Sequence, residues 1–140
     1  MFSKTYAAAI RGVDALLVQV EADISDGLPG LELVGFLASE LREAKERVRV
    51  AIHNAGIALP PKKITVNLSP ADVRKEGTAF DLAIAVAILT ASGHLSEELI
   101  RQTMFVGELS LGGCLNPVNG IRPIACCAKE CGITRLVVPE

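Results

Sequence analysis

The sequence predicts one α/β domain of the α+β type, in which a mixed sheet carries helices mainly on one side. Strand-like segments separated by turns open the 140-residue chain, and apolar helical segments then alternate with short strands. Half of the residues are apolar and only 21% are charged, which is typical of a chain with a well-buried core. A meander of strands followed by alternating helices and strands implies a mixed sheet with one covered face.

Three predicted strands begin the chain. Residues 2–10 and 15–24 read as strands joined by a turn at residues 11–14. Apolar and polar residues alternate in the second strand, so we expect one buried and one wetter face. A turn at residues 27–30 leads to a third strand over residues 31–36. We expect these three strands to start the sheet in antiparallel order.

The clearest helical pattern covers residues 37–55, where apolar residues recur at steps of three and four. Ser39 is its expected N-cap and Gly56 its expected C′ residue, and Glu43 is expected to pair with Arg47. Residues 63–68 then read as a fourth strand, after the proline pair that ends the loop.

A second helix is predicted over residues 78–92. Thr78 is its expected N-cap, with Asp81 three residues later in the capping pattern [ST]-x-x-[DE], and Gly93 ends it. Further along we expect a short helix at residues 96–101, a strand at 104–111, a last helix ending at Cys131, and a terminal strand at 135–138.

Charge and hydropathy exclude several classes of protein. The chain has 14 basic and 16 acidic residues, which gives no overall attraction to nucleic acid or membranes. The longest apolar run, residues 82–92, is about half of what a bilayer crossing needs, so we interpret it as a buried helix. The first residues lack the compact apolar core of a signal peptide, and we expect a cytoplasmic protein. The chain stops just after a predicted strand, which we interpret as a boundary within a longer protein.

The four cysteines are expected to be free thiols. Cys126, Cys127 and Cys131 fall in one predicted helix, where a disulfide would have strained geometry. No CxxC pair occurs, and neither His53 nor His94 lies at a ligand spacing from the cysteines. A zinc site remains the alternative.

Nucleotide and hydrolase motifs are missing from the sequence. No G-x-x-x-x-G-K-[ST] loop or G-x-G-x-x-G turn occurs, so nothing cradles a phosphate. The serines lie at turns, caps or strand ends, which argues against a serine–histidine–acid triad. Asp72 and Glu76, beside Arg74 and Lys75, are interpreted as a solvated cluster of ion pairs.

Two long runs carry a family resemblance: RKEGTAFDLAIAVAILTASG and GELSLGGCLNPVNGIRPIACCAKECGITRLVVPE. With the upstream GLPGLELVGF, ERVRVAIHNAG and KKITVNLSPADVRKEG, they resemble the N-terminal domain of the ComM/YifB family of magnesium-chelatase-like AAA+ ATPases. One departure is Leu37-Ala38, where the family commonly has Pro-Asp. The resemblance implies an AAA+ motor after residue 140 that uses ATP and magnesium. It also implies a homo-hexamer that acts on DNA, in branch migration during natural transformation.

This domain in turn is similar to the proteolytic domain of Lon-type proteases, whose fold is like that of ribosomal protein S5 domain 2. Such proteases pair a serine, after a Lys-Asp-Gly-Pro turn, with a lysine after a Gly-Gly-Leu element. The resemblance places Ala79 at the serine position and Arg122 at the lysine position. Alanine cannot attack a carbonyl, and arginine cannot give up its proton to act as a base. Thr78 is explained by capping. We therefore assign no catalytic, cofactor-binding or metal-binding residue to this chain.

The leading hypothesis is a noncatalytic accessory or assembly domain whose partner is the AAA+ domain of the same chain. The first alternative is a nucleic-acid-binding module, for which Arg42, Lys45 and Arg49 are the candidate contacts on one helix face, diluted there by Glu46. The second alternative is residual Lon-type peptidase activity.

Overall fold

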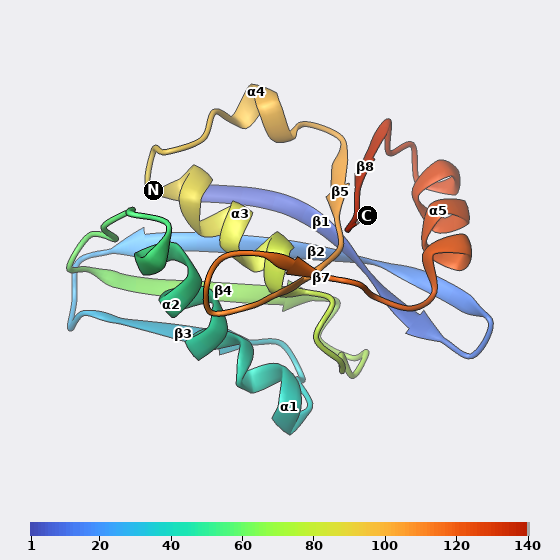
Figure 1. Ribbon diagram of the computed structural model, residues 1–140, viewed down its shortest axis with the longest axis horizontal. Helices are drawn as coiled ribbons and strands as arrows, with labels where there is room; N and C mark the ends of the chain where they lie inside the picture. Colours follow the sequence, from blue (N-terminus) through green and yellow to red (C-terminus); the bar gives the residue numbers. More distant parts are fainter. Residues whose placement is uncertain (140) are drawn as a thin grey trace.

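A computed structural model describes residues 1–139 and contains a mixed six-stranded sheet with a small hairpin beside it (Figure 1). The strand order is β3-β4-β2-β1-β5-β8, and β6 and β7 form the hairpin. The strands are β1 Phe2–Arg11, β2 Asp14–Ser25, β3 Gly30–Val34, β4 Lys63–Ser69, β5 Thr103–Phe105, β6 Glu108–Leu109, β7 Leu115–Asn116 and β8 Arg135–Val137. The helices are α1 Ser39–Arg42, α2 Ala44–Asn54, α3 Asp81–Ala91, α4 Glu97–Ile100 and α5 Ile121–Glu130. The predicted α+β class is confirmed.

The first two strands form the expected antiparallel hairpin, with Arg11 opposite Asp14. Val18, Val20 and Ala22 of β2 are fully buried, as the alternation predicted. The expected place of the third strand is wrong, because β3 does not pair with β2. It pairs in parallel with β4, which lies between β3 and β2. The chain returns from β3 to β4 through α1 and α2, and a helical crossover of this kind joins parallel neighbours.

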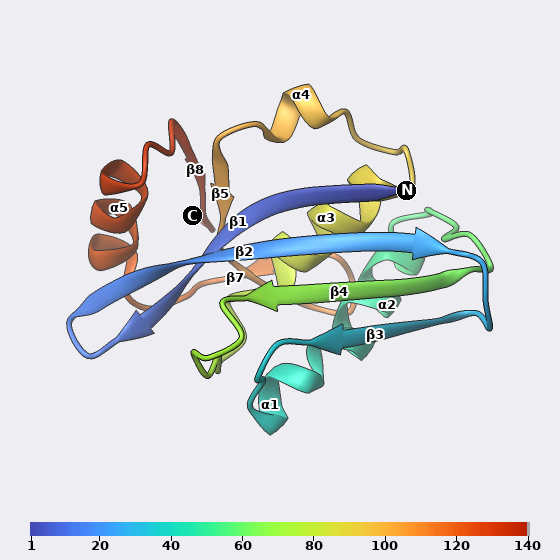
Figure 2. The same ribbon diagram turned by 180° about the vertical axis from the view of Figure 1, so that it is seen from behind.

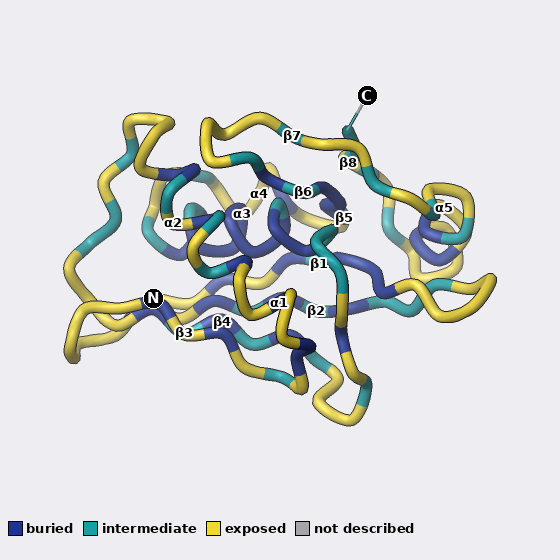
Figure 3. Tube along the Cα trace, turned by 60° about the horizontal axis from the view of Figure 1, so that its bottom comes forward, coloured by how far each residue is buried: buried dark blue, intermediate teal, exposed yellow. Residues whose placement is uncertain are grey.

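Helices cover the two faces of the sheet unequally. On one face α3 packs against β1 and β2, and α2 packs beside α3, which together build the larger core (Figure 1). On the opposite face α5 is the one helix of residues 1–139 that packs against β1 and β2, and these residues leave the rest of that face open (Figure 2). The expectation of helices mainly on one side therefore holds. Figure 3 shows α3 as largely buried, whereas the β1–β2 turn and the outer side of α5 are exposed.

The helix predicted at residues 37–55 forms in two pieces. Glu43 interrupts it between α1 and α2, and Gly56 follows α2 with a left-handed φ of 84°, as expected of a C′ residue. Ser39 is not the N-cap, since it is already the first helical residue and Ala38 caps the helix without a side-chain bond. The Ala38 N–H instead donates to the Lys75 carbonyl, so tertiary contacts fix this helix start.

The predicted capping by Thr78 is also wrong. The helix α3 begins at Asp81, and its N-cap residue is Phe80, which makes no side-chain cap bond. The strand expected at residues 104–111 is split into β5 and β6, and a contact between distant segments explains the break. After β5 the Gly107 N–H donates to the Ala79 carbonyl, which pulls the chain out of the sheet before β6 begins. Within residues 1–139, no helix is long and apolar enough to cross a membrane.

Candidate functional site

A cavity of about 760 Å³ opens at the start of α3, where the sequence placed the degenerate site. Its size lies in the range of ligand-binding clefts. Five parts of the chain form it: the end of β1 with its turn, the loop before α3, the loop before α5, one residue of β6 and one residue of α5. We call this cavity the groove. It is lined by Ala8, Ala9, Ile10, Arg11, Gly12, Arg74, Glu76, Gly77, Thr78, Ala79, Phe80, Glu108, Pro117, Val118, Asn119 and Ile124.

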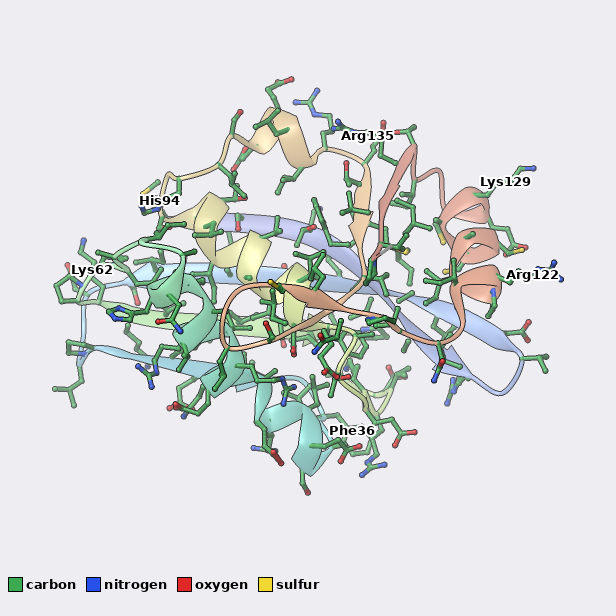
Figure 4. All side chains as sticks on the ribbon, in the orientation of Figure 1. Phe36, Lys62, His94, Arg122, Lys129 and Arg135 are labelled. Carbon is green, nitrogen blue, oxygen red and sulfur yellow. The ribbon has the colours of Figure 1, made fainter. Side chains whose placement is uncertain are left out.

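The groove contains Ala79 but not Arg122. Ala79 is half-buried in its wall, and its carbonyl is held by the Gly107 N–H at 3.0 Å. Arg122 is exposed in the first turn of α5, and its side chain points outward from the domain (Figure 4). It lines a separate cavity beside Val13 and Asp14. The structure therefore does not bring the two positions of the Lon-type dyad together around one substrate site.

Behind the groove, Asp81 is part of a buried ion pair. The Arg47 guanidinium donates to both carboxylate oxygens of Asp81 at 2.7 and 3.0 Å, and the Leu109 N–H donates to the same carboxylate at 3.1 Å. Asp81 is fully buried, and the Arg47 side chain is 21% exposed. Burial raises the pKa of Asp81, against the opposing hydrogen bonds from Arg47 and Leu109. The expected pair of Arg47 with Glu43 is thus replaced by a contact that ties α2 and β6 to α3.

Thr78 belongs to the groove rather than to a helix cap. Hydrogen bonds from the Thr78 hydroxyl and from the Asn116 amide lower the pKa of Glu108, with Asn116 Nδ2 at 3.0 Å from Glu108 Oε1. Glu108 is therefore held as a carboxylate, already occupied by two donors. Because its pKa is lowered, Glu108 is a weak base toward the Thr78 hydroxyl.

Lys75 is the residue that sequence reasoning placed most wrongly. It was expected in a solvated cluster, but its side chain is fully buried, and its ammonium donates to the carbonyls of Gly35 and Pro70. The Lys75 N–H also donates to the Phe36 carbonyl at 3.0 Å. Gly35 has a φ of 120°, and a Cβ there would lie 2.2 Å from the Leu68 carbonyl oxygen, so only glycine fits. Burial lowers the pKa of Lys75.

The rest of the expected cluster is solvated as predicted. Arg74 and Glu76 form an exposed ion pair at 2.9 Å. No sequence pattern distinguishes Lys75 from its charged neighbours, because its burial depends on the close approach of the segment after β3. The lysine therefore lies at the junction of two loops, where it fixes the segment that leads into the groove.

The three candidate nucleic-acid contacts lie on α1 and α2 outside the groove. Arg49 is paired with Glu46 at 2.8 Å, and Lys45 lies 4.0 Å from Glu32 on β3. Arg42 is exposed. Because acidic side chains neighbour two of the three, the net positive field of this surface is weak.

The cysteines do not form a cluster with acidic or histidine ligands. Cys114, Cys126 and Cys131 are exposed thiols, and Cys127 is buried. Burial raises the pKa of Cys127 to about 11, which keeps it protonated and unreactive. In the part of the chain that the structure describes, no group of three or more His, Cys, Asp or Glu side chains is placed to hold a metal ion.

Comparison with known proteins gives a consistent family. A family model described as subunit ChlI of Mg-chelatase matches residues 20–140. Competence protein ComM of Haemophilus influenzae is 46% identical over 125 residues, which cover 89% of this chain and 25% of that protein. The uncharacterized protein YifB of Escherichia coli is 48% identical over 118 residues, which cover 84% of this chain and 23% of that protein.

A more distant likeness connects the chain to a protease. The Lon protease of Mycolicibacterium smegmatis is 23% identical over 139 residues, which cover 94% of this chain and 18% of the protease. The mixed sheet with α3 and α5 on its two faces is compatible with that likeness. The chain thus belongs to the ComM/YifB family of magnesium-chelatase-like AAA+ ATPases. It spans about a quarter of the length of these ComM and YifB relatives.

Proposed function

We propose that this chain is the noncatalytic N-terminal accessory domain of a magnesium-chelatase-like AAA+ ATPase. The observation that carries the proposal is the groove, in which Ala79 takes the place of a nucleophile while Arg122 points away from it. Behind the groove, the charged groups of the buried Asp81 and Lys75 are hydrogen-bonded to other parts of the chain. These bonds hold the loop before α3 in place. A supported site without the serine and lysine of a Lon-type dyad suits binding or assembly rather than hydrolysis.

For the whole protein we propose an ATP-driven machine in the cytoplasm, with the motor following residue 140. ATP and magnesium are its cofactors, the motor domain is the partner of this domain, and the assembly is a homo-hexamer. The similarity to a competence protein supports a role on DNA, such as branch migration during natural transformation. In this arrangement the accessory domain acts on the assembly or on its partners, and the motor grips the DNA.

An assay of peptidase activity tests the noncatalytic role directly. Fluorescent casein incubated with the full chain is expected to stay intact, because Ala79 has no nucleophilic group, Arg122 points away from the groove, and the lowered pKa of Glu108 makes it a weak base toward Thr78. Turnover that disappears in Thr78→Ala would show that Thr78 is a nucleophile and would overturn the proposal. Walker motifs in the sequence after residue 140 would support the motor assignment, and their absence would remove it.

A further inference from the structure

We propose that the groove binds an extended peptide segment of a partner protein, which adds a strand to the free edge of β1. The inference goes beyond the accessory role, because it gives the degenerate site a ligand. It does not depend on whether a motor follows the chain. Binding of this kind needs an unpaired strand edge, room for side chains, and main-chain donors and acceptors on the facing wall.

The first requirement is met by β1. On the side away from β2, β1 pairs with β5 at Tyr6 alone within the described residues. The chain after β5 turns aside, since the Val106 N–H donates to Val137 and the Gly107 N–H to Ala79. From Ala8 to Arg11 the edge therefore faces the groove over about 13 Å, enough for four residues of a strand.

The direction of the edge groups follows from the hairpin register. Arg11 and Asp14 flank a two-residue turn and so form a hydrogen-bonded pair, after which bonded and non-bonded pairs alternate along β1 and β2. Ala9 accordingly bonds to β2, whereas Ile10 directs its N–H and C=O toward the groove. An extended peptide would find these groups at the spacing of a β-ladder.

The facing wall offers backbone donors and an apolar floor. Thr78, Ala79 and Phe80 all line the groove. Among residues 1–139 their backbone N–H groups donate no hydrogen bond, so these groups are free to bond to a ligand. The half-buried Val118 supplies apolar surface on the same side as Ala79, and Ile124, which is almost fully buried, packs in the same cluster. A peptide between the two walls would therefore be bonded through its backbone on both sides and would place small apolar side chains on the floor.

Charge indicates which peptides fit best. Of the charged residues that line the groove, Arg74 and Glu76 form an ion pair, and Glu108 keeps its negative charge while it accepts hydrogen bonds from Thr78 and Asn116. Arg11 is exposed and makes no ion pair within the described part of the chain. The groove as a whole therefore carries no net charge, but the cation of Arg11 at the end of β1 favours a peptide with an acidic residue at that position.

The test uses fluorescein-labelled β-casein, an acidic chain without a stable fold, and the full chain of this protein. Fluorescence anisotropy is expected to show saturable binding without cleavage. Ala79→Trp fills the groove and is expected to weaken binding at least tenfold. The matched control Ala125→Trp, on the exposed side of α5, is expected to leave binding within twofold of wild type. Equal binding by these two variants would overturn the proposal, as would no binding by the wild type.

A second pair of variants guards against misfolding of Ala79→Trp. Val118→Glu places a charge on the groove floor and is expected to weaken binding, whereas Val13→Glu at the exposed hairpin turn is not. Hydrogen exchange of the wild type gives an independent result, because β-casein is expected to protect the amides of residues 8–11 and 78–80. Protection confined to other segments would show that the peptide binds elsewhere and would refute the groove as its binding site. Cleavage of β-casein in the same assay would overturn the noncatalytic role while leaving peptide binding in place.

Discussion

The loop before α3 has two sides that differ in what their side chains do. On the inner side Lys75 and Asp81 are buried, and their charged groups are bonded to carbonyls, to Arg47 and to the Leu109 N–H. On the outer side Ala79 lines the groove and has no nucleophilic group of its own. The difference teaches that a site can keep the buried contacts that hold its backbone in place while it lacks the residues that would catalyse a reaction. This is possible because different residues carry the two roles.

The largest expected effect tests the inner side through Asp81. Asp81→Ala leaves the Arg47 guanidinium and the Leu109 N–H without their acceptor, and removing one partner of a buried pair costs about 3 kcal/mol or more. Urea unfolding measures the loss. Glu46→Ala, which breaks the exposed pair with Arg49, is the control and is expected to change stability by less than about 1 kcal/mol. Similar losses in both variants would contradict a structural role for the buried pair.

Lys75 offers a second test of the inner side. Lys75→Met leaves the carbonyls of Gly35 and Pro70 unsatisfied, which is expected to cost about 1–3 kcal/mol at neutral pH. Lys4→Met, at an exposed position of β1, serves as the control and is expected to stay close to wild type. Chemical denaturation of the three proteins under one set of conditions provides the comparison.

The same lysine predicts a dependence on pH. Burial lowers the pKa of Lys75 below its ordinary value of 10.5, so the unfolded chain binds more protons than the folded chain between the lowered value and 10.5. The free energy of unfolding of the wild type is therefore expected to rise with pH in this interval, relative to Lys75→Met. Parallel pH profiles for the two proteins would show that the ammonium is not desolvated.

The outer side is tested by adding the missing groups. The double variant Ala79→Ser, Arg122→Lys is expected to remain inactive on fluorescent casein, because position 122 directs its side chain away from the groove. A dyad needs its geometry as well as its two residues. Hydrolysis above the wild-type background would show that α5 can turn toward the groove, and the contrast between the two sides would then be weaker.

The smallest effect is expected for the surface of α1 and α2. Changing Arg42, Lys45 and Arg49 to glutamine is expected to alter DNA binding little, because we expect the isolated domain to bind DNA with a Kd no tighter than about 10⁻⁵ M near physiological salt. Fluorescence anisotropy with single- and double-stranded DNA at two salt concentrations checks this. Submicromolar binding that the triple variant loses would make this surface a nucleic-acid interface.

Much of the local structure was predictable because periodicity reports directly on burial. The alternation in β2 predicted Val18, Val20 and Ala22 as core, and the apolar run over residues 82–92 predicted the buried helix α3. These features depend on residues close in sequence, so the sequence by itself determined the element types and the core faces. The family resemblance singled out Ala79 as the position without a nucleophile, and the structure places that residue in the wall of the groove.

Only the tertiary structure decided the contacts between distant segments. Arg47 bonds to Asp81 across 34 residues rather than to Glu43 four residues away, and Thr78 lies beside Glu108 instead of capping α3. Lys75 is buried because the chain after β3 passes next to it, and β4 lies between β2 and β3 because the crossover through α1 and α2 returns there. No local pattern encodes these pairings, since a buried charge takes whichever partner the packed elements bring within bonding distance, and desolvation makes that partner obligatory.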